Sequence, residues 1–199
     1  KQMRQEPCRV FVCCFSLEKD ELMMWNYYGG RNAGCNIEVD LLDPSVSSFH
    51  GMDIKRSNVI YGEESHSSIK ELLYLAHKIW KKSGNEDFIK RFIVMQLNAL
   101  RIFLKNAAFK NEREYRIALL VPEAEMDDVG VKFFVRGNMM IPYIEMELGD
   151  IEAEIQGITL GPYARNELNK SSVSDLLRMN NLKDVPIHFS QVPMRNYLG

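Results

Sequence analysis

The sequence lacks a long hydrophobic run and an excess of either charge. No stretch of about 18 apolar residues occurs, so we expect no membrane-spanning segment. The 25 Lys and Arg residues nearly balance the 27 Asp and Glu residues, giving a net charge of −2. This balance disfavours a surface built to neutralise nucleic-acid phosphates. With 46% hydrophobic residues among its 199 positions, the chain is long enough for one packed core, and we expect a single domain over residues 1–199.

Cysteine is scarce, and no pair has the Cys-x-x-Cys spacing. The four cysteines are Cys8, Cys13, Cys14 and Cys35, and the middle two lie in an apolar run. This pattern predicts buried, reduced thiols in a cytoplasmic protein. The four histidines are also far apart in the sequence, so we expect no metal site.

Several nucleotide-binding and hydrolase motifs are absent. The chain contains no Gly-x-Gly-x-x-Gly, Walker loop, Gly-x-Ser-x-Gly or His-Glu-x-x-His. The dinucleotide-binding, phosphate-loop, serine-hydrolase and zinc-protease classes that carry these motifs are therefore disfavoured.

The hydrophobic pattern predicts an α+β fold with mainly antiparallel sheets. Strands are predicted at 8–16, 34–42, 59–61, 112–121, 131–135, 141–148, 155–160 and 185–191. A short helix is predicted between a cap at Asp20 and a stop at Gly29 and Gly30. Longer helices are predicted from the Ser68-x-x-Glu71 capping box to Gly84, from Asn85 to Phe109, and from 166 to 179. Helices thus gather in a central insertion at about 66–109, which favours α+β over a doubly wound fold.

The segment Glu112-Arg113-Glu114-Tyr115-Arg116 carries the strongest chemical signal. In a strand, Glu112, Glu114 and Arg116 line one face, and Tyr115 begins the other. Two neighbouring carboxylates repel, so one pKa rises unless a cation lies nearby. Such a pair polarises a hydroxyl or stabilises positive charge in an enzyme, or it forms a solvated Arg–Glu ladder in a structural strand.

A second candidate site combines aromatic residues with glycine. Trp25 and Tyr28 are separated by three positions on one helical turn, just before Gly29. Aromatic rings in this arrangement stack on flat rings such as nicotinamide, or they plug the core. A third candidate is Arg136 at a strand end, which is placed either to meet a phosphate or to pair with Glu145 or Glu147.

These segments resemble, in order, the bacterial family called domain of unknown function 2971. The shared features are Phe15-Ser16, Met24-Trp25-x-x-Tyr28, Ile37-x-Val39-Asp40, Glu112-x-Glu114-Tyr115-Arg116, Pro142-Tyr143 and Ile158-x-x-Gly161-Pro162. The family opens with a His-Tyr-Thr/Ser strand and an Asn-Asp-Pro loop that are not present in this chain. We therefore expect Lys1 to lie inside a longer polypeptide, or to begin a portion whose earlier segment is missing.

The resemblance implies a layout similar to the His-Tyr-Glu arrangement of ADP-ribosyltransferases. By that analogy Tyr28 stacks on nicotinamide, Ser16 contacts its amide, and Glu114 or Glu112 is the catalytic carboxylate. Trp25, Arg116 and Arg136 complete the expected NAD-binding set. The implied function is an NAD-dependent ADP-ribosyltransferase or NAD glycohydrolase that acts as an antiphage-defence or toxin effector, with NAD as substrate.

Other roles for the same sequence stay open. One is a non-catalytic ligand-sensing or protein-interaction module of a defence system, because the expected His-bearing strand is missing. Lysine clusters such as Lys78, Lys81 and Lys82 are most simply solvated helix faces rather than a nucleic-acid site. The macromolecular target is not indicated by the sequence. The wide apolar arc of the 85–109 segment is compatible with a homodimer interface.

Overall fold

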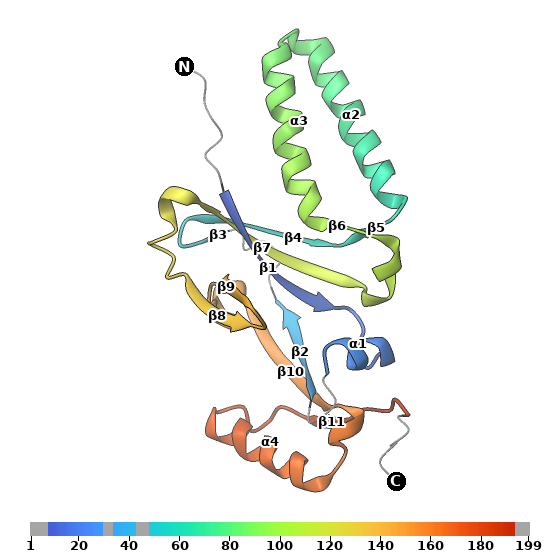
Figure 1. Cartoon of the computed structure of the whole chain (residues 1–199), viewed down its shortest axis with the longest axis vertical. Helices are drawn as coiled ribbons and strands as arrows, with labels where there is room; N and C mark the ends of the chain where they lie inside the picture. Colours follow the sequence, from blue (N-terminus) through green and yellow to red (C-terminus); the bar gives the residue numbers. More distant parts are fainter. Residues whose placement is uncertain (1–7, 30–33, 43–47, 194–199) are drawn as a thin grey trace. The chain divides into compact units, whose positions relative to one another are not determined.

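The computed structural model describes residues 8–29, 34–42 and 48–193. The chain divides into two compact units. The first unit contains Lys1–Phe11, Glu18–Ile54 and Leu120–Gly199, and the second contains Val12–Leu17 and Lys55–Leu119. Helices occur together with antiparallel strand pairs, which confirms the predicted α+β class (Figure 1). None of the helices in the described ranges is both long and apolar enough to cross a membrane.

A three-stranded sheet with one covering helix forms the core of the first unit. Its order is β11-β10-β2, with β2 (Cys35–Leu41) antiparallel and β11 (Ile187–Phe189) parallel to β10 (Ala153–Leu160). Ile158 and Leu160 of β10 pack with Ala164 and with Leu177 of α4 (Glu167–Met179). As predicted, Asn166 begins α4, and its side chain accepts a hydrogen bond from the Asn169 N–H. The apolar alternation of β10 thus places its buried face against α4.

The short helix α1 (Leu22–Tyr27) begins without the predicted cap. Its N-cap is Glu21, and no side chain caps it. Asp20 instead accepts hydrogen bonds from Trp25 Nε1, Ser190 Oγ and the Gln191 N–H, each at 2.6 Å. The carboxylate therefore ties α1 to the chain after β11. Gly30, half of the predicted stop, lies outside the described residues.

Other strands lie wholly or partly in the first unit. A hairpin pairs β8 (Lys132–Arg136) with β9 (Met139–Tyr143), so the predicted strand 141–148 ends at Tyr143. Three-residue and four-residue 3-10 turns lie at Glu123–Glu125, Pro162–Ala164 and Leu148–Ile151. β3 (Ser48–Phe49) pairs with β4 (Met52–Asn58), neither of which was predicted.

An antiparallel helix pair dominates the second unit (Figure 1). α2 (Glu64–Ser83) ends, as predicted, at Gly84, whose φ of 63° suits a residue without a Cβ. α3 (Glu86–Leu100) begins at the predicted cap, where Asn85 accepts a hydrogen bond from the Phe88 N–H. The predicted capping box at Ser68 is wrong, because α2 has already begun there and Ser68 Oγ donates to the Glu64 carbonyl.

The predicted helix 85–109 is also too long. After Leu100 the chain forms a 3-10 turn (Arg101–Phe103), then β6 (Leu104–Lys105), which pairs in parallel with β5 (Ile60–Tyr61). Asn106 then caps a second 3-10 helix, Ala107–Glu112. Leu104 and Lys105 thus pair with β5, and Asn106 caps the next helix, where the apolar pattern predicted that helical hydrogen bonds would continue. Within the second unit, parts of β1 (Cys8–Ser16), β7 (Glu114–Pro122) and β4 lie in the order β1-β7-β4.

The prediction of buried thiols is wrong. All four cysteine side chains are exposed. Cys8, Cys13 and Cys14 lie on β1, which ends the strand order β1-β7-β4-β3, and most of its side chains are exposed. β1 is an edge strand, and the side chains of an apolar edge strand can stay exposed. The apolar composition of β1 therefore did not decide whether its cysteines are buried.

Candidate functional site

Charged side chains gather in the second unit where the chain enters β7. Glu112 ends a 3-10 helix, Arg113 has a positive φ of 42°, and Glu114 begins the strand. Glu112 is therefore not on the strand face where the sequence placed it. The left-handed turn at Arg113 nevertheless leaves the two carboxylates beside one another, because both bind the same cation.

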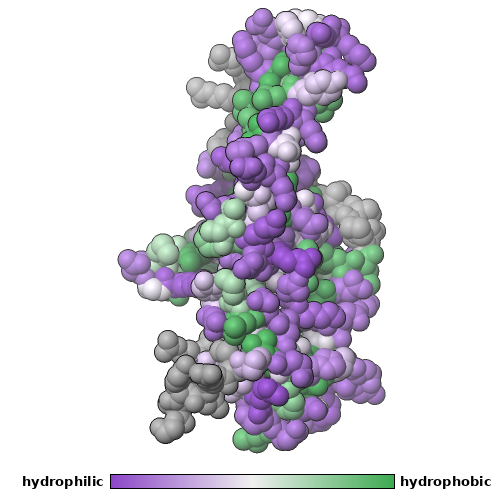
Figure 2. Space-filling model, turned by 90° about the vertical axis from the view of Figure 1, so that its right-hand side faces the viewer, coloured by the Kyte–Doolittle hydropathy of each residue, from purple (hydrophilic) through white to green (hydrophobic). Residues whose placement is uncertain are grey.

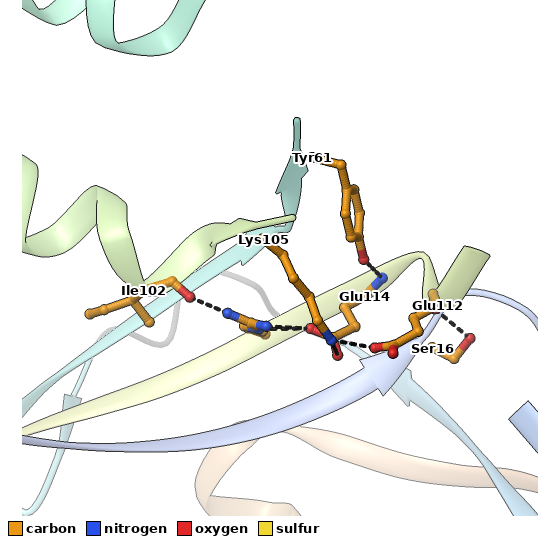
Figure 3. Close-up of polar contacts among 7 residues, drawn as sticks. Ser16, Tyr61, Ile102, Lys105, Glu112 and Glu114 are labelled. Atoms are coloured by element: carbon orange, nitrogen blue, oxygen red, sulfur yellow. Dashed lines mark hydrogen bonds and ion pairs between the residues drawn. The ribbon is translucent and has the colours of Figure 1, made fainter. Parts of the chain in front are cut away.

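That cation is Lys105, from β6. Its Nζ donates to Glu112 Oε2 and, at 2.8 Å, to Glu114 Oε1 (Figure 3). The ammonium also lies 4.8 Å from the centroid of the Phe109 ring. Lys105 thus neutralises the repulsion between the carboxylates, which is the condition that the sequence left open.

Arg116 holds the second oxygen of Glu114. Its Nε donates to Glu114 Oε2 at 2.8 Å, and its second terminal nitrogen lies 2.7 Å from the same oxygen. The first terminal nitrogen donates to the Ile102 carbonyl at 2.5 Å. Glu114 and Arg116 share a strand face as predicted, and both carboxylate oxygens of Glu114 are bound by a cation.

Backbone contacts fix the position of the two acids. The Glu114 N–H donates to the Tyr61 hydroxyl at 2.9 Å, and its carbonyl accepts from the Val59 N–H at 2.8 Å. The Ser16 hydroxyl donates to the Glu112 carbonyl at 3.0 Å, as Figure 3 shows. β1, β5 and β6 therefore all hold this short segment. We call Lys105, Glu112, Glu114 and Arg116 the carboxylate cluster.

The carboxylate cluster is largely shielded from solvent. The side chains of Glu112 and Glu114 are each 8% exposed, against 20% for Lys105 and 15% for Arg116. Burial by itself raises the pKa of the Glu114 carboxyl, but hydrogen bonding with Lys105, Glu112 and Arg116 lowers it below its ordinary value. Burial likewise lowers the pKa of Lys105, and hydrogen bonds to the two carboxylates raise it. Glu114 is therefore an ionised carboxylate at neutral pH.

An ionised and oriented carboxylate has a limited set of chemical uses. It can stabilise a positive charge that develops nearby, or accept hydrogen bonds from a hydroxyl. Because two cations face two carboxylates, the carboxylate cluster has no formal net charge when all four groups are ionised. Among residues 8–29, 34–42 and 48–193, no group of three or more His, Cys, Asp or Glu side chains could hold a metal ion.

The other predicted site residues belong to the first unit. Trp25 is only 6% exposed and donates its indole N–H to Asp20. Its ring is covered by glycines, since a Cβ at Gly29 would lie 2.8 Å from Cε3 and one at Gly161 would lie 2.9 Å from Cζ3. Trp25 thus has the contacts of a core residue.

Tyr28 and Arg136 are exposed. Tyr28 has 64% of its surface exposed and an edge contact with the ring of Tyr27. Arg136 lies at the exposed end of β8. Glu145, one of the two acids considered as its partner, forms an ion pair with Lys132 at 2.5 Å.

Sequence reasoning missed two members of the site, Lys105 and Tyr61. Lys105 was placed inside a helix that in fact ends five residues earlier. A usable signal was present, because two adjacent buried carboxylates require a nearby cation, and Lys105 follows the apolar run Ile102-Phe103-Leu104. Tyr61 gave no comparable signal.

Comparison with known proteins gives a match to one family model. Neither the curated proteins nor the solved structures give a match. The family model matches the segment that contains Trp25, both long helices and Glu112–Arg116, which supports the resemblance drawn from these residues. Over residues 24–117 the chain is similar to the family described as Protein of unknown function (DUF2971).

Proposed function

We propose that the chain consumes NAD as an ADP-ribosyltransferase-like enzyme and acts as a defence or toxin effector. The observation that supports this proposal is the ionised Glu114, which Lys105 and Arg116 hold in one orientation. A carboxylate in this state is the group that cleavage of a glycosidic bond requires. Glu112, on the same lysine, is the second acid of the proposed site.

The proposed reaction develops positive charge on the ribose. The bond between ribose and nicotinamide breaks, and its electron pair leaves with the pyridine nitrogen. The remaining oxocarbenium-like cation is stabilised by the Glu114 carboxylate. Water or a nucleophile of the target then attacks the ribose carbon and loses a proton. The product is free or target-linked ADP-ribose.

Measurement of nicotinamide release from NAD tests the proposal. We expect turnover by the full chain, and a loss of about 100-fold or more in Glu114→Gln, because removal of one preorganised electrostatic group typically has this effect. Glu145→Gln is the matched control, since Glu145 is an exposed carboxylate on a different segment. Equal rates in the two variants, or no nicotinamide release and no transfer with a broad panel of targets, contradict the proposal.

The closed geometry of the carboxylate cluster favours a second candidate function. Both Glu114 oxygens are bound within the protein and its side chain is 8% exposed. This arrangement suits a non-catalytic role, and the alternative is a ligand-sensing or protein-interaction module of a defence system, with NAD or a related nucleotide as the ligand to be tested. The two functions are distinguished by combining turnover with thermal unfolding. A rise in the midpoint of unfolding with NAD, without nicotinamide release, supports the sensing module.

A further inference from the structure

The α2–α3 pair exposes apolar side chains that nothing in its own unit covers. Leu75 of α2 is 47% exposed, and Phe88 and Met95 of α3 are 48% and 49% exposed. Figure 2 shows hydrophobic residues (green) at the surface of this helix pair among hydrophilic ones (purple). Three large apolar side chains of this size, half-exposed on adjacent helices, indicate an interaction surface.

These residues lie on one side of the helix pair. Leu75 comes one position before the buried Ala76, and Phe88 comes one position before the buried Ile89. Because α2 and α3 run in opposite directions, positions that precede inward-facing residues lie on the same side of the pair. We call this side the Leu75 flank.

Charge along α2 on the Leu75 flank changes sign at Leu75. The α2 residues on this flank are spaced alternately by four and three positions. They are Glu64, Ser68, Glu71, Leu75, Lys78 and Lys82. The acids precede Leu75 and the lysines follow it. A second α2 laid antiparallel across Leu75 therefore places Glu71 opposite Lys78 and Ser68 opposite Lys82, and the reverse contact is identical.

The α3 side of the same flank fits the same symmetry. Its stripe is Phe88, Phe92, Met95 and Ala99, and Phe88 stacks with Phe92. The midpoint of this stripe and Leu75 are about equally far from the turn at Gly84, so both lie at one height along the pair. One two-fold axis can therefore pair α2 with α2 and the apolar α3 stripes with each other.

The opposite side of the helix pair does not have this self-complementarity. It exposes Leu73 and Trp80, but its charged residues are Lys70, Lys81, Lys90 and Arg101 against Glu86 and Asp87, and Lys90 pairs with Glu86 of its own helix. A second copy placed there brings an excess of positive charge against itself, which opposes association.

We propose that the Leu75 flank binds the same flank of a second copy of this chain, forming a four-helix interface. The occupant is assigned by the charge pattern, because an antiparallel copy of α2 places Glu71 of each chain against Lys78 of the other, whereas Glu64 is paired with Lys110 of its own chain. The proposal does not depend on the chemistry of the carboxylate cluster.

Charge reversal on α2 gives the sharpest test. Analytical ultracentrifugation of the full chain is expected to give twice the 23.1 kDa of one chain. Glu71→Lys alone places three lysines on the flank, and Lys78→Glu with Lys82→Glu places acids there. Each variant alone is expected to associate at least about 10-fold more weakly, because like charges then face each other. An equimolar mixture of the two variants is expected to regain the dimer mass.

Controls separate the proposal from other interfaces. Trp80→Ala on the opposite flank is expected to leave the dimer intact, whereas Met95→Lys on the Leu75 flank is expected to weaken it. These residues are exposed, and far-ultraviolet circular dichroism checks that each variant is folded. A monomeric wild-type chain at about 100 μM, well above the dissociation constant of a stable dimer, overturns the proposal. So does a dimer that neither charge-reversal variant weakens, or a mixture that stays monomeric.

Discussion

Arg116 donates hydrogen bonds to two acceptors on different segments of the chain. It binds Glu114 Oε2 and the Ile102 carbonyl from one guanidinium. Replacement of Arg116 with methionine keeps much of the packing volume but leaves a buried carboxylate with one cation fewer. We expect a loss of about 3 kcal/mol in the free energy of unfolding, because breaking one partner out of a buried ion pair is costly.

Urea denaturation of the Arg116→Met variant measures this loss. The control is Lys132→Met, which removes the exposed ion pair with Glu145 and is expected to cost less than about 1 kcal/mol. Similar losses in the two variants would mean that the carboxylate cluster contributes no more than a surface pair.

The lowered pKa of Glu114 also makes stability depend on pH. Its folded-state pKa lies below the ordinary value of 4.5, so ionised Glu114 stabilises the fold at pH values above 4.5. This contribution is lost as the pH falls from 4.5 through the lower folded-state pKa. We expect the free energy of unfolding to fall in this acid range, and to fall less steeply in Glu114→Gln.

Chemical denaturation between pH 7 and pH 3 gives the two slopes. Asp20 also has a lowered pKa, where burial raises it but hydrogen bonds from Ser190, Gln191 and Trp25 lower it more. Asp20 lies in the first unit, whereas Glu114 lies in the second. The Asp20→Asn variant therefore removes the contribution of the first unit's carboxylate from the pH dependence, and the remaining slope reports on the second unit. An unchanged slope in Glu114→Gln argues against a lowered pKa at this position.

At the scale of the element, only one of the two predicted helix caps, Asn85 and Ser68, acts as a cap. Asn85 caps α3 through the Phe88 N–H, whereas Ser68 lies inside α2 and bonds to the Glu64 carbonyl. We expect Asn85→Ala to lower the free energy of unfolding by about 1 kcal/mol. Ser68→Ala is expected to change it by less than about 0.5 kcal/mol, because an exposed residue inside a helix contributes little.

Thermal or urea unfolding of the two alanine variants makes this comparison directly. A larger loss in Ser68→Ala than in Asn85→Ala would instead place the start of α2 at the capping box that the sequence predicts.

Helix ends with a local chemical signal were predictable from the sequence. Gly84, Asn85 and Asn166 were all assigned correctly, because a left-handed turn or a capping side chain acts within a few residues. The end of α3 was not, because Leu104 and Lys105 leave the helix to pair with β5, more than 40 residues earlier. β4 was missed because only Met52 and Ile54 carry its buried alternation.

The same distinction applies to the candidate site. Glu114 and Arg116 were predictable because residues two apart share a strand face, and the structure joins them directly. The place of Glu112 was wrong, since the positive φ at Arg113 ends the 3-10 helix just before the strand. Lys105 and Tyr61 reach the site through the β5–β6 pairing, which no local pattern predicts. The need of two neighbouring carboxylates for a cation was the one signal that pointed to Lys105, and Tyr61 had none.

At the scale of the whole molecule, the exposure of the cysteines differs from the burial that the sequence predicts. All four are exposed. We therefore expect a thiol-specific reagent to modify four thiols per native chain without denaturant. The Cys13 and Cys14 side chains are exposed overall, but partial desolvation of their sulfur atoms raises the pKa of both thiols, so these two are expected to react in a slower phase.

Absorbance of the released chromophore, followed at pH 8, counts both phases. The Cys13→Ser and Cys14→Ser variants should each remove one equivalent from the slow phase. Fewer than four modified thiols in the native protein, with four after denaturation, would restore the expectation of burial.

The burial of Trp25 gives the chain a pair of separate optical reporters. The sequence contains two tryptophans, Trp25 and Trp80. Trp25 is enclosed by glycines in the first unit, whereas Trp80 is 41% exposed on α2 in the second unit. A water-soluble quencher is therefore expected to reduce the fluorescence of Trp80 first, while the fluorescence of Trp25 remains. Each compact unit thus carries its own fluorescent signal, and the unfolding of one can be followed apart from the other.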